Sequence, residues 1–383
     1  MPPPSYRPAT LAAQAMGSID PQTRGIVPPI HVATTFLRDP DNRYSSGFVY
    51  GRPDNQTVRE AEHTRAMQEG ATAGALLFGS GMAAAVAVFA TLDPGDHVVA
   101  PQIMYWALRH WLLNDAPRLG LSVDFVGMDD AGAVAHAIRP GKTRLVWVET
   151  PGNPLWTVTD IAAVAAHAHA AGARVAVDST AASPYHTRPL AHGADLVMHA
   201  ATKILNGHSD VVAGVLLGAE ADAAWQRLVQ YRRLHGAILG PFEAFLLQRG
   251  LRTFCLRAAA QARSAQRLAE RLAAHQLVAR VLYPGLPDDA GHAVARRQME
   301  NGFGYMLSIR VAGGEAAAIA TAAAVQLWRR ATSLGGVESL IEHRASIEGA
   351  GTPCPTDLLR LSVGIEDVDD LYADLDAALH AAA

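Results

Sequence analysis

The chain has 383 residues, of which half are hydrophobic, and a formal net charge of −4 at pH 7. This length suffices for a large core and predicts two or three domains. The charge favours neither nucleic acid nor an anionic membrane as a partner, and no 18-residue apolar run predicts a membrane span. The N-terminus lacks a signal-peptide pattern, and Cys255 and Cys354 form no CxxC pair, which indicates a reducing cytoplasm.

The first segment, residues 1–53, is rich in Pro, Gly and polar residues and reads as an arm rather than a domain. Residues 28–36 should be extended, since a residue before proline avoids the helical region. An arm without its own core must pack on something, and a second subunit is one candidate. Tyr50 and Arg52 are two residues apart, so in an extended segment they point the same way; the alternative is that both are solvated.

The second segment, residues 54–239, alternates short apolar runs with helical stretches. This alternation predicts an α/β fold with a doubly wound, mostly parallel sheet. Asn55 or Thr57 is a candidate cap for the first helix. The predicted strands are 74–78, 97–100, 121–126, 145–149, 174–178, 196–198 and 211–217; the predicted helices are 58–69, 84–92, 105–113, 131–138 and 161–170.

The third segment, residues 240–383, has a different texture and predicts a smaller C-terminal α+β domain. Two long amphipathic helices open it, and a third helix ends the chain. The predicted helices are 241–250, 253–275 and 367–382, and the predicted strands are 278–283, 306–311 and 358–363.

Lysine is nearly absent from this chain: of 32 Lys and Arg residues only Lys142 and Lys203 are lysines. Arginine supplies surface charge but cannot act as a deprotonated amine nucleophile, whereas lysine can. Lys203 lies in a polar loop after strand 196–198, at the strand edge where α/β sheets bind ligands. This favours a functional lysine over a solvated one, although a GC-rich codon bias would also deplete lysine.

The turn Gly79-x-Gly81-x-x-Ala84 lies between a predicted strand and a helix, where backbone amides bind phosphate. The next strand ends in Ala100-Pro101-Gln102 and lacks the acidic residue that binds an adenosine ribose. We therefore predict a phosphate site without a dinucleotide. A glycine turn made only for packing is the alternative, and a nicotinamide oxidoreductase is a remote one.

Asp178 ends the strand 174–178 and so faces the same kind of edge as Lys203. A phosphate cradle, a strand-end Asp and a strand-end Lys are the requirements for pyridoxal 5′-phosphate (PLP). The Lys would attach the cofactor, and the Asp would keep its pyridine nitrogen protonated. Tyr105 could stack on the ring or pack in the core.

Other constellations do not indicate a site. His167 and His169 are two apart on a helix and point to different faces, so no metal pair is predicted. Ser80 within Gly79-Ser80-Gly81 does not match the G-x-S-x-G of a hydrolase.

Several stretches in order resemble the Cys/Met-metabolism (transsulfuration) family of PLP enzymes, of fold type I, over nearly the whole chain. They are residues 50–52, 80–84, 149–154, 177–180, 201–210, 249–253, 333–340 and 359–364.

The resemblance implies a role for each matched residue. The cofactor would be attached through Lys203, paired at its ring nitrogen with Asp178, held at its phosphate by Gly81, Met82 and Thr202, stacked on Tyr105 and contacted by Asn153. Lys203 would also move protons, with Tyr105 beside it as a catalytic residue. Tyr50 and Arg52 would reach the phosphate of a neighbouring subunit, and a homo-oligomer, expected as a dimer of dimers, would result. Arg360, with Ser333, Leu334 and Asn153, would bind the carboxylate of an amino-acid substrate.

The chain departs from the family pattern mainly on the substrate side. Ala200 stands where many members have Ser, residues 106–108 replace a Gly-Gly-Thr-like turn, and residues 341–346 replace a Pro-containing run that leads to Thr-His. The cofactor side keeps the family's residues apart from Ala200.

The type of reaction is predicted from positions that differ between members of the family. The position before Ser333 is Thr332, where γ-enzymes often carry Glu and a well-known β-lyase carries Tyr. Ala200 and the turn 106–108 lean towards β-elimination, which would convert cystathionine to homocysteine, pyruvate and ammonia, as a cystathionine β-lyase does. Residues 333–336 lean towards γ-chemistry, so cystathionine γ-synthase or γ-lyase activity is the alternative. A catalytically silent relative is a third hypothesis.

Overall fold

The computed structural model describes residues 6–14, 19–349 and 352–383. The chain divides into two compact units, Met1–Asp93 with Asp195–Cys255 and Pro94–Ala194 with Leu256–Ala383. The division expected from the sequence follows chain order and stays a prediction. In the described part of the chain no helix is both long and apolar enough to cross a membrane. Residues 1–5, part of the N-terminus screened for a signal peptide, lie outside the described residues.

The first unit contains three strands in the order β1-β7-β6, with both pairings antiparallel. Their bounds are Gly74–Phe78 for β1, Leu196–His199 for β6 and Gly214–Gly218 for β7. The strand predicted at 211–217 begins later than expected. The cause is that the Ala213 amide donates to Thr202 Oγ1 at 3.0 Å, and the Thr202 amide donates to the Ala213 carbonyl at 3.1 Å. Ala213 therefore pairs with the Lys203 loop instead of with a neighbouring strand.

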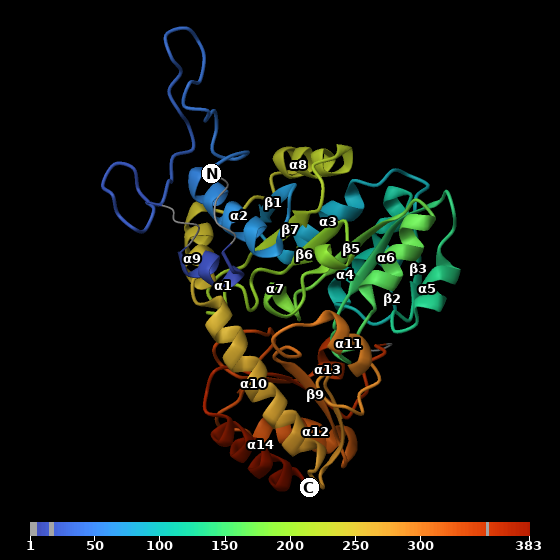
Figure 1. The fold of residues 1–383 in the computed structure, drawn as a ribbon. Coiled ribbons are helices and arrows are strands. Elements are labelled where there is room, and N and C mark those ends of the chain that lie inside the picture. Colours follow the sequence, from blue (N-terminus) through green and yellow to red (C-terminus); the bar gives the residue numbers. More distant parts are fainter. Residues whose placement is uncertain (1–5, 15–18, 350–351) are drawn as a thin grey trace. The chain divides into compact units, whose positions relative to one another are not determined.

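Among the described residues of this unit, five helices accompany these strands (Figure 1). They are α1 (Pro8–Gln14), α2 (Gln56–Glu69), α3 (Gly81–Ala90), α8 (Ala223–His235) and α9 (Pro241–Leu251). α2 packs on β1 and α9, and α3 packs on β7. Asn55 caps α2, because its side chain accepts hydrogen bonds from the amides of Thr57 and Val58. Of the two candidate caps, Asn55 is therefore the one that forms. Helix α8 was not predicted, because this polar helix buries only Trp225 and Leu228.

The second unit contains the parallel α/β part that the alternation predicted. Its strands β2 (His97–Pro101), β3 (Ser122–Val126), β4 (Thr143–Glu149) and β5 (Arg174–Asp178) have the order β5-β4-β2-β3. All three pairings are parallel. Helices α4 (Trp106–Asn114), α5 (Ala131–Ala137) and α6 (Ile161–Ala170) follow strands β2, β3 and β4. This register places Glu149 opposite Asp178.

A second sheet in this unit has the order β10-β11-β12-β9-β8. Its strands are β8 (Val278–Leu282), β9 (Met306–Val311), β10 (Arg329–Arg330), β11 (Leu340–His343) and β12 (Leu358–Ser362). The helices α10 (Phe254–Ala273), α12 (Gly314–Ala324) and α14 (Val368–Ala382) supply the facing apolar residues, and their core includes Leu268, Ala318, Ile341, Leu361 and Leu371 (Figure 1).

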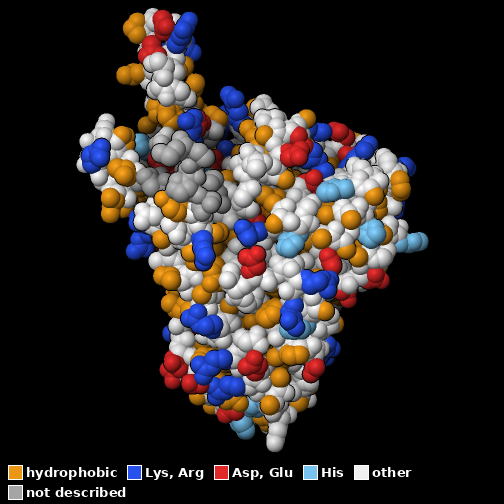
Figure 2. Space-filling model, viewed as in Figure 1, with side chains coloured by type: hydrophobic (Ala, Val, Ile, Leu, Met, Phe, Trp, Pro, Cys, Tyr) orange, Lys and Arg blue, Asp and Glu red, His pale blue; other side chains and the backbone are white. Residues whose placement is uncertain are grey.

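Five short elements complete the described part of the second unit: α7 (Ser183–His186), α11 (His292–Gln298), α13 (Arg344–Glu348) and two turns of 3-10 helix at 116–119 and 189–192. The sequence did not predict α11–α13, β10 or β11. Figure 2 shows basic and acidic side chains interspersed over the visible face of the described residues. The small net charge is thus made of many local charges of both signs.

Candidate active site

The predicted phosphate cradle forms the beginning of α3 in the first unit. Ser80 caps this ten-residue helix, because its Oγ accepts the Ala83 amide at 3.0 Å. The amides of Gly81 and Met82 precede the first intrahelical bond, and the positive end of the helix dipole favours an anion there. The cradle therefore fits a phosphate group.

Glycines let the cradle approach the lysine loop. A Cβ on Gly81 would lie 2.8 Å from the Ala200 methyl, and a Cβ on Gly214 would lie 2.2 Å from the Ser80 carbonyl. The start of α3 therefore abuts both the residue after β6 and the first residue of β7. Ala200, which stands where many relatives have Ser, fills this contact with a methyl group.

Lys203 lies in the turn between β6 and β7, and its backbone is held on both sides. Its amide donates to the Ala200 carbonyl at 3.1 Å, and its carbonyl accepts the Gly207 amide at 2.8 Å. Thr202 is tied to Ala213 through both its backbone and its hydroxyl. The first unit thus brings together Gly81, Thr202 and Lys203, all predicted to bind the cofactor.

The arm residues are placed differently from the expectation. Tyr50 forms an isolated bridge with Thr35, and residues 51–53 make a turn instead of continuing an extended segment. The Tyr50 side chain is 48% exposed, and an Arg52 guanidinium N–H donates to the Arg233 carbonyl. The predicted contact of Tyr50 and Arg52 with a neighbouring subunit stays a prediction.

Asp178 ends β5 in the second unit and is buried. Its Oδ1 accepts the Thr180 amide at 3.0 Å and the Thr180 hydroxyl at 2.5 Å. These two bonds fix the orientation of the carboxylate. A buried, fixed carboxylate suits a cationic partner such as a protonated pyridine nitrogen.

Glu149 is a site residue that the sequence analysis missed. Its Oε2 accepts the Tyr105 amide at 2.7 Å and its Oε1 accepts the Asn153 amide at 3.0 Å, so one side chain anchors two predicted site residues. Burial first, and then the negative charge of Asp178, raise the pKa of Glu149 to about 8. Two acidic groups buried this close favour a cation beside them, which is a further point of fit to the protonated cofactor ring.

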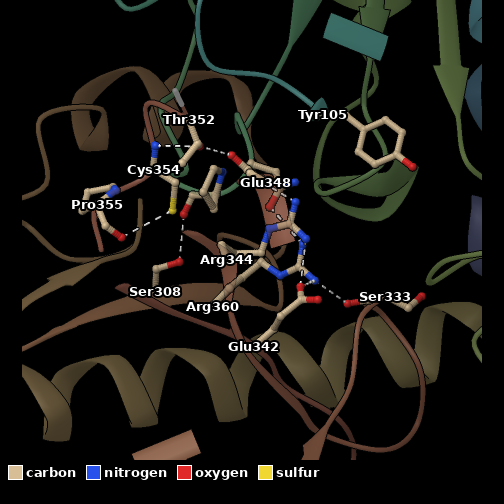
Figure 3. A network of polar contacts seen from close by, with 12 residues as sticks. Tyr105, Ser308, Ser333, Glu342, Arg344, Glu348, Thr352, Cys354, Pro355 and Arg360 are labelled. Carbon is tan, nitrogen blue, oxygen red and sulfur yellow. Dashed lines mark hydrogen bonds and ion pairs between the residues drawn. The ribbon is translucent and has the colours of Figure 1, made fainter. Parts of the chain in front are cut away.

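Arg360 joins the predicted substrate residues of the second unit (Figure 3). One guanidinium nitrogen donates to Asn153 Oδ1 at 3.2 Å, and the other donates to the Ser333 carbonyl at 2.9 Å and to Glu342 Oε2 at 2.6 Å. Burial, and then the charge of Arg344, lower the pKa of Arg360 to about 10, so Arg360 stays cationic at neutral pH. A buried guanidinium held this way is suited to bind a carboxylate.

The loop beside Arg360 has an unusual backbone. Ser333 has a φ of 94°, in the region that glycine favours, and its carbonyl points to Arg360. Leu334 is buried, and the Gly335 amide donates to Ser362 Oγ at 2.8 Å. Such conformations persist only where surrounding contacts hold them, and they gather at functional sites.

Two further charged residues extend this network, and the sequence analysis gave them no role. The Arg344 guanidinium donates to Glu342 Oε2 at 2.9 Å and to Glu348 Oε1 at 2.9 Å, while the Thr352 hydroxyl donates to Glu348 Oε2 (Figure 3). Arg344 lies in the run 341–346. The departure of this run from the family pattern was the one sequence feature that could have pointed to Arg344. Arg344 is the first residue of helix α13, and Glu348 is its last.

These observations define a PLP enzyme of the α/β class. The chain belongs to the Cys/Met metabolism PLP-dependent enzyme family, whose profile matches residues 9–380.

The relatives cover almost the full length of the chain. Cystathionine gamma-synthase of Mycobacterium tuberculosis (strain ATCC 25618 / H37Rv) is 44% identical over 379 residues, covering 97% of this chain and 96% of the relative. Cystathionine beta-lyase of Coxiella burnetii is 38% identical over 369 residues, covering 94% of each. The crystal structure of cystathionine gamma synthase from Xanthomonas oryzae pv. oryzae, in complex with aminoacrylate and cysteine, superposes with a TM-score of 0.93 at 37% identity over 98% of both chains.

The comparisons confirm the fold class and PLP as the cofactor of this family, and the family's transsulfuration chemistry. They give no support to the nicotinamide oxidoreductase. They also favour the γ-synthase alternative over the β-elimination that Ala200 and residues 106–108 suggested, because the γ-synthase relative is the more similar of the two.

Proposed function

We propose that this enzyme catalyses γ-replacement: an O-acyl-L-homoserine and L-cysteine give L-cystathionine and the carboxylic acid of the acyl group. The bond between Cγ and the ester oxygen breaks, a Cγ–sulfur bond forms, and the thiol proton leaves with the acid. The observation that carries this proposal is the 44% identity to a cystathionine gamma-synthase over 97% of the chain. Amino-acid substrates follow from the same family.

The proposed roles of the residues follow from the chemistry of the Cγ bond. PLP, when bound, supplies the electron sink that makes the Cα proton acidic. Loss of a group at Cγ also requires a proton to leave Cβ, so Lys203 would act at both carbons as the base. Arg360 and Asn153 would orient the substrate carboxylate, and Glu149 would hold the backbones of Asn153 and Tyr105.

β-Elimination of cystathionine is the second candidate. It needs only the Cα proton to leave before the sulfur does, so Lys203 would act as the base at one carbon instead of two. Ala200 and the turn 106–108 favour it, and Thr332 matches neither reaction class.

The two candidates differ in their products. Purified enzyme is incubated with O-acetyl- or O-succinyl-L-homoserine and cysteine, and separately with cystathionine alone; products are identified by mass spectrometry. We expect cystathionine from the first mixtures. If cystathionine gives pyruvate and homocysteine and neither ester gives cystathionine, the reaction is β-elimination and the proposed γ-replacement is wrong.

The homo-oligomer, proposed as a dimer of dimers, rests on the arm and on family resemblance. The arm residues Ile26, Val32 and Leu37 are exposed hydrophobic side chains, as an interface would require. The native mass of the holoenzyme would check this proposal.

A further inference from the structure

The second unit contains a cavity of about 170 Å³ that is lined by chain neighbours of Tyr105 and Asn153. One water needs about 10–15 Å³, so this cavity holds a group much larger than a water molecule. Met104 and Trp106, on either side of Tyr105, line it, and so does Pro154, which follows Asn153. The cavity therefore adjoins Tyr105 and Asn153, two residues predicted to contact the cofactor.

Charges of opposite sign line this cavity. Arg109 belongs to the first turns of α4, and its guanidinium carbon lies 5.1 Å from the centre of the Phe125 ring. Its Nε is buried and has no hydrogen-bond partner among the described residues. Glu348 and Thr352 line the cavity as well, and Thr352 donates to the Glu348 carboxylate.

The charge of Glu348 is coupled to the carboxylate-binding arginine. Arg344 bridges Glu348 to Glu342, and Glu342 binds Arg360, so these four buried side chains alternate in sign (Figure 3). The four charges cancel when every group is ionised. Each carboxylate oxygen of Glu348 accepts one bond, and a carboxylate has about four acceptor sites, so Glu348 can also accept an ammonium group.

A ligand that pairs with both charged side chains must carry an ammonium group for Glu348 and a carboxylate for Arg109. We propose that this cavity binds the zwitterionic head group of the second amino acid, the one whose sulfur is joined to Cγ. This inference rests on the proposed γ-replacement. It makes Arg109 and Glu348 specificity-determining residues that favour cysteine over small thiols, because hydrogensulfide and methanethiol have no head group for either residue.

The test compares two sulfur donors in the same holoenzyme, with the O-acylhomoserine that the wild type uses. Glu348→Gln and Arg109→Met are each expected to raise KM for cysteine about tenfold, as loss of one charged hydrogen bond does, and to leave KM for hydrogensulfide within about twofold. Gln102→Ala, a neutral exposed lining residue, is the matched control and should change neither value. Arg109→Met leaves the Arg344 bridge intact and so serves if Glu348→Gln fails to fold.

Equal changes in KM for both donors, or an unchanged KM for cysteine, would overturn the head-group site. Failure of the proposed function is a separate result, since the wild type would then make no cystathionine from either ester. In that case KM is measured for cleavage of cystathionine, which carries a second head group, and of an analogue that ends in a methyl group, S-methylcysteine for β-elimination or methionine for γ-elimination. The two variants must then raise KM for cystathionine only, and equal effects on the two substrates would refute the proposal.

Discussion

Replacing Lys203 by Ala is expected to abolish turnover, with kcat falling by on the order of 10⁴-fold or more, as when other enzymes lose a residue central to the chemistry. Arginines cannot replace the lost amine, because they remain protonated. The other lysine, Lys142, is exposed in the turn after Arg139. Steady-state kinetics with the γ-replacement assay measure the effect.

Lys142→Ala is the matched control and should keep wild-type rates, since only an exposed side chain is lost. Thermal unfolding should give similar midpoints for both variants. A Lys203→Ala enzyme that still turned over at a rate near the wild type would remove this lysine from the mechanism.

Asp178→Asn is expected to lower kcat by on the order of 10²–10³-fold while part of the cofactor remains bound. A neighbouring opposite charge shifts a pKa by about one to three units, and a neutral amide cannot hold the ring nitrogen protonated in this way. The absorbance spectrum of the purified variant reports the bound cofactor, and steady-state kinetics report kcat.

Thr180→Val is the graded comparison for this variant. It removes the hydroxyl that donates to Asp178 at 2.5 Å. It keeps the carboxylate and the hydrogen bond that the backbone amide of residue 180 donates to it. A loss of about tenfold is expected, as for one hydrogen bond to a charged group. Rates for Asp178→Asn close to those of Thr180→Val would mean that the charge of Asp178 is not what matters.

The sequence predicted those elements whose signals are local. Helix α6 has its predicted bounds, because an Ala-rich apolar stretch follows Asp160, whose side chain caps it. Strand β5 is likewise a short apolar run that ends at Asp178. Lys203 was found because lysine is scarce in this chain, and both Lys203 and Asp178 were found because they lie at the ends of predicted strands. Both signals can be read from the sequence alone.

Elements that depend on distant partners were missed. β11 buries Glu342 and His343, and a strand with two buried polar residues has no apolar alternation to read. Glu342 is buried because Arg360 and Arg344 neutralise it, and Arg360 is 18 residues away. Glu149 acts through the amide of Tyr105, 44 residues away, so no spacing rule pointed to it.

Attachment of the cofactor to Lys203 can be measured directly. The holoenzyme is reduced with borohydride, digested, and its lysine-containing peptides are weighed by mass spectrometry. Since the chain has only two lysines, only the peptides that contain them need to be weighed. We expect the mass of the reduced cofactor on the peptide with Lys203 and an unmodified peptide with Lys142; cofactor on Lys142, or on neither lysine, would rule out Lys203 as the attachment point.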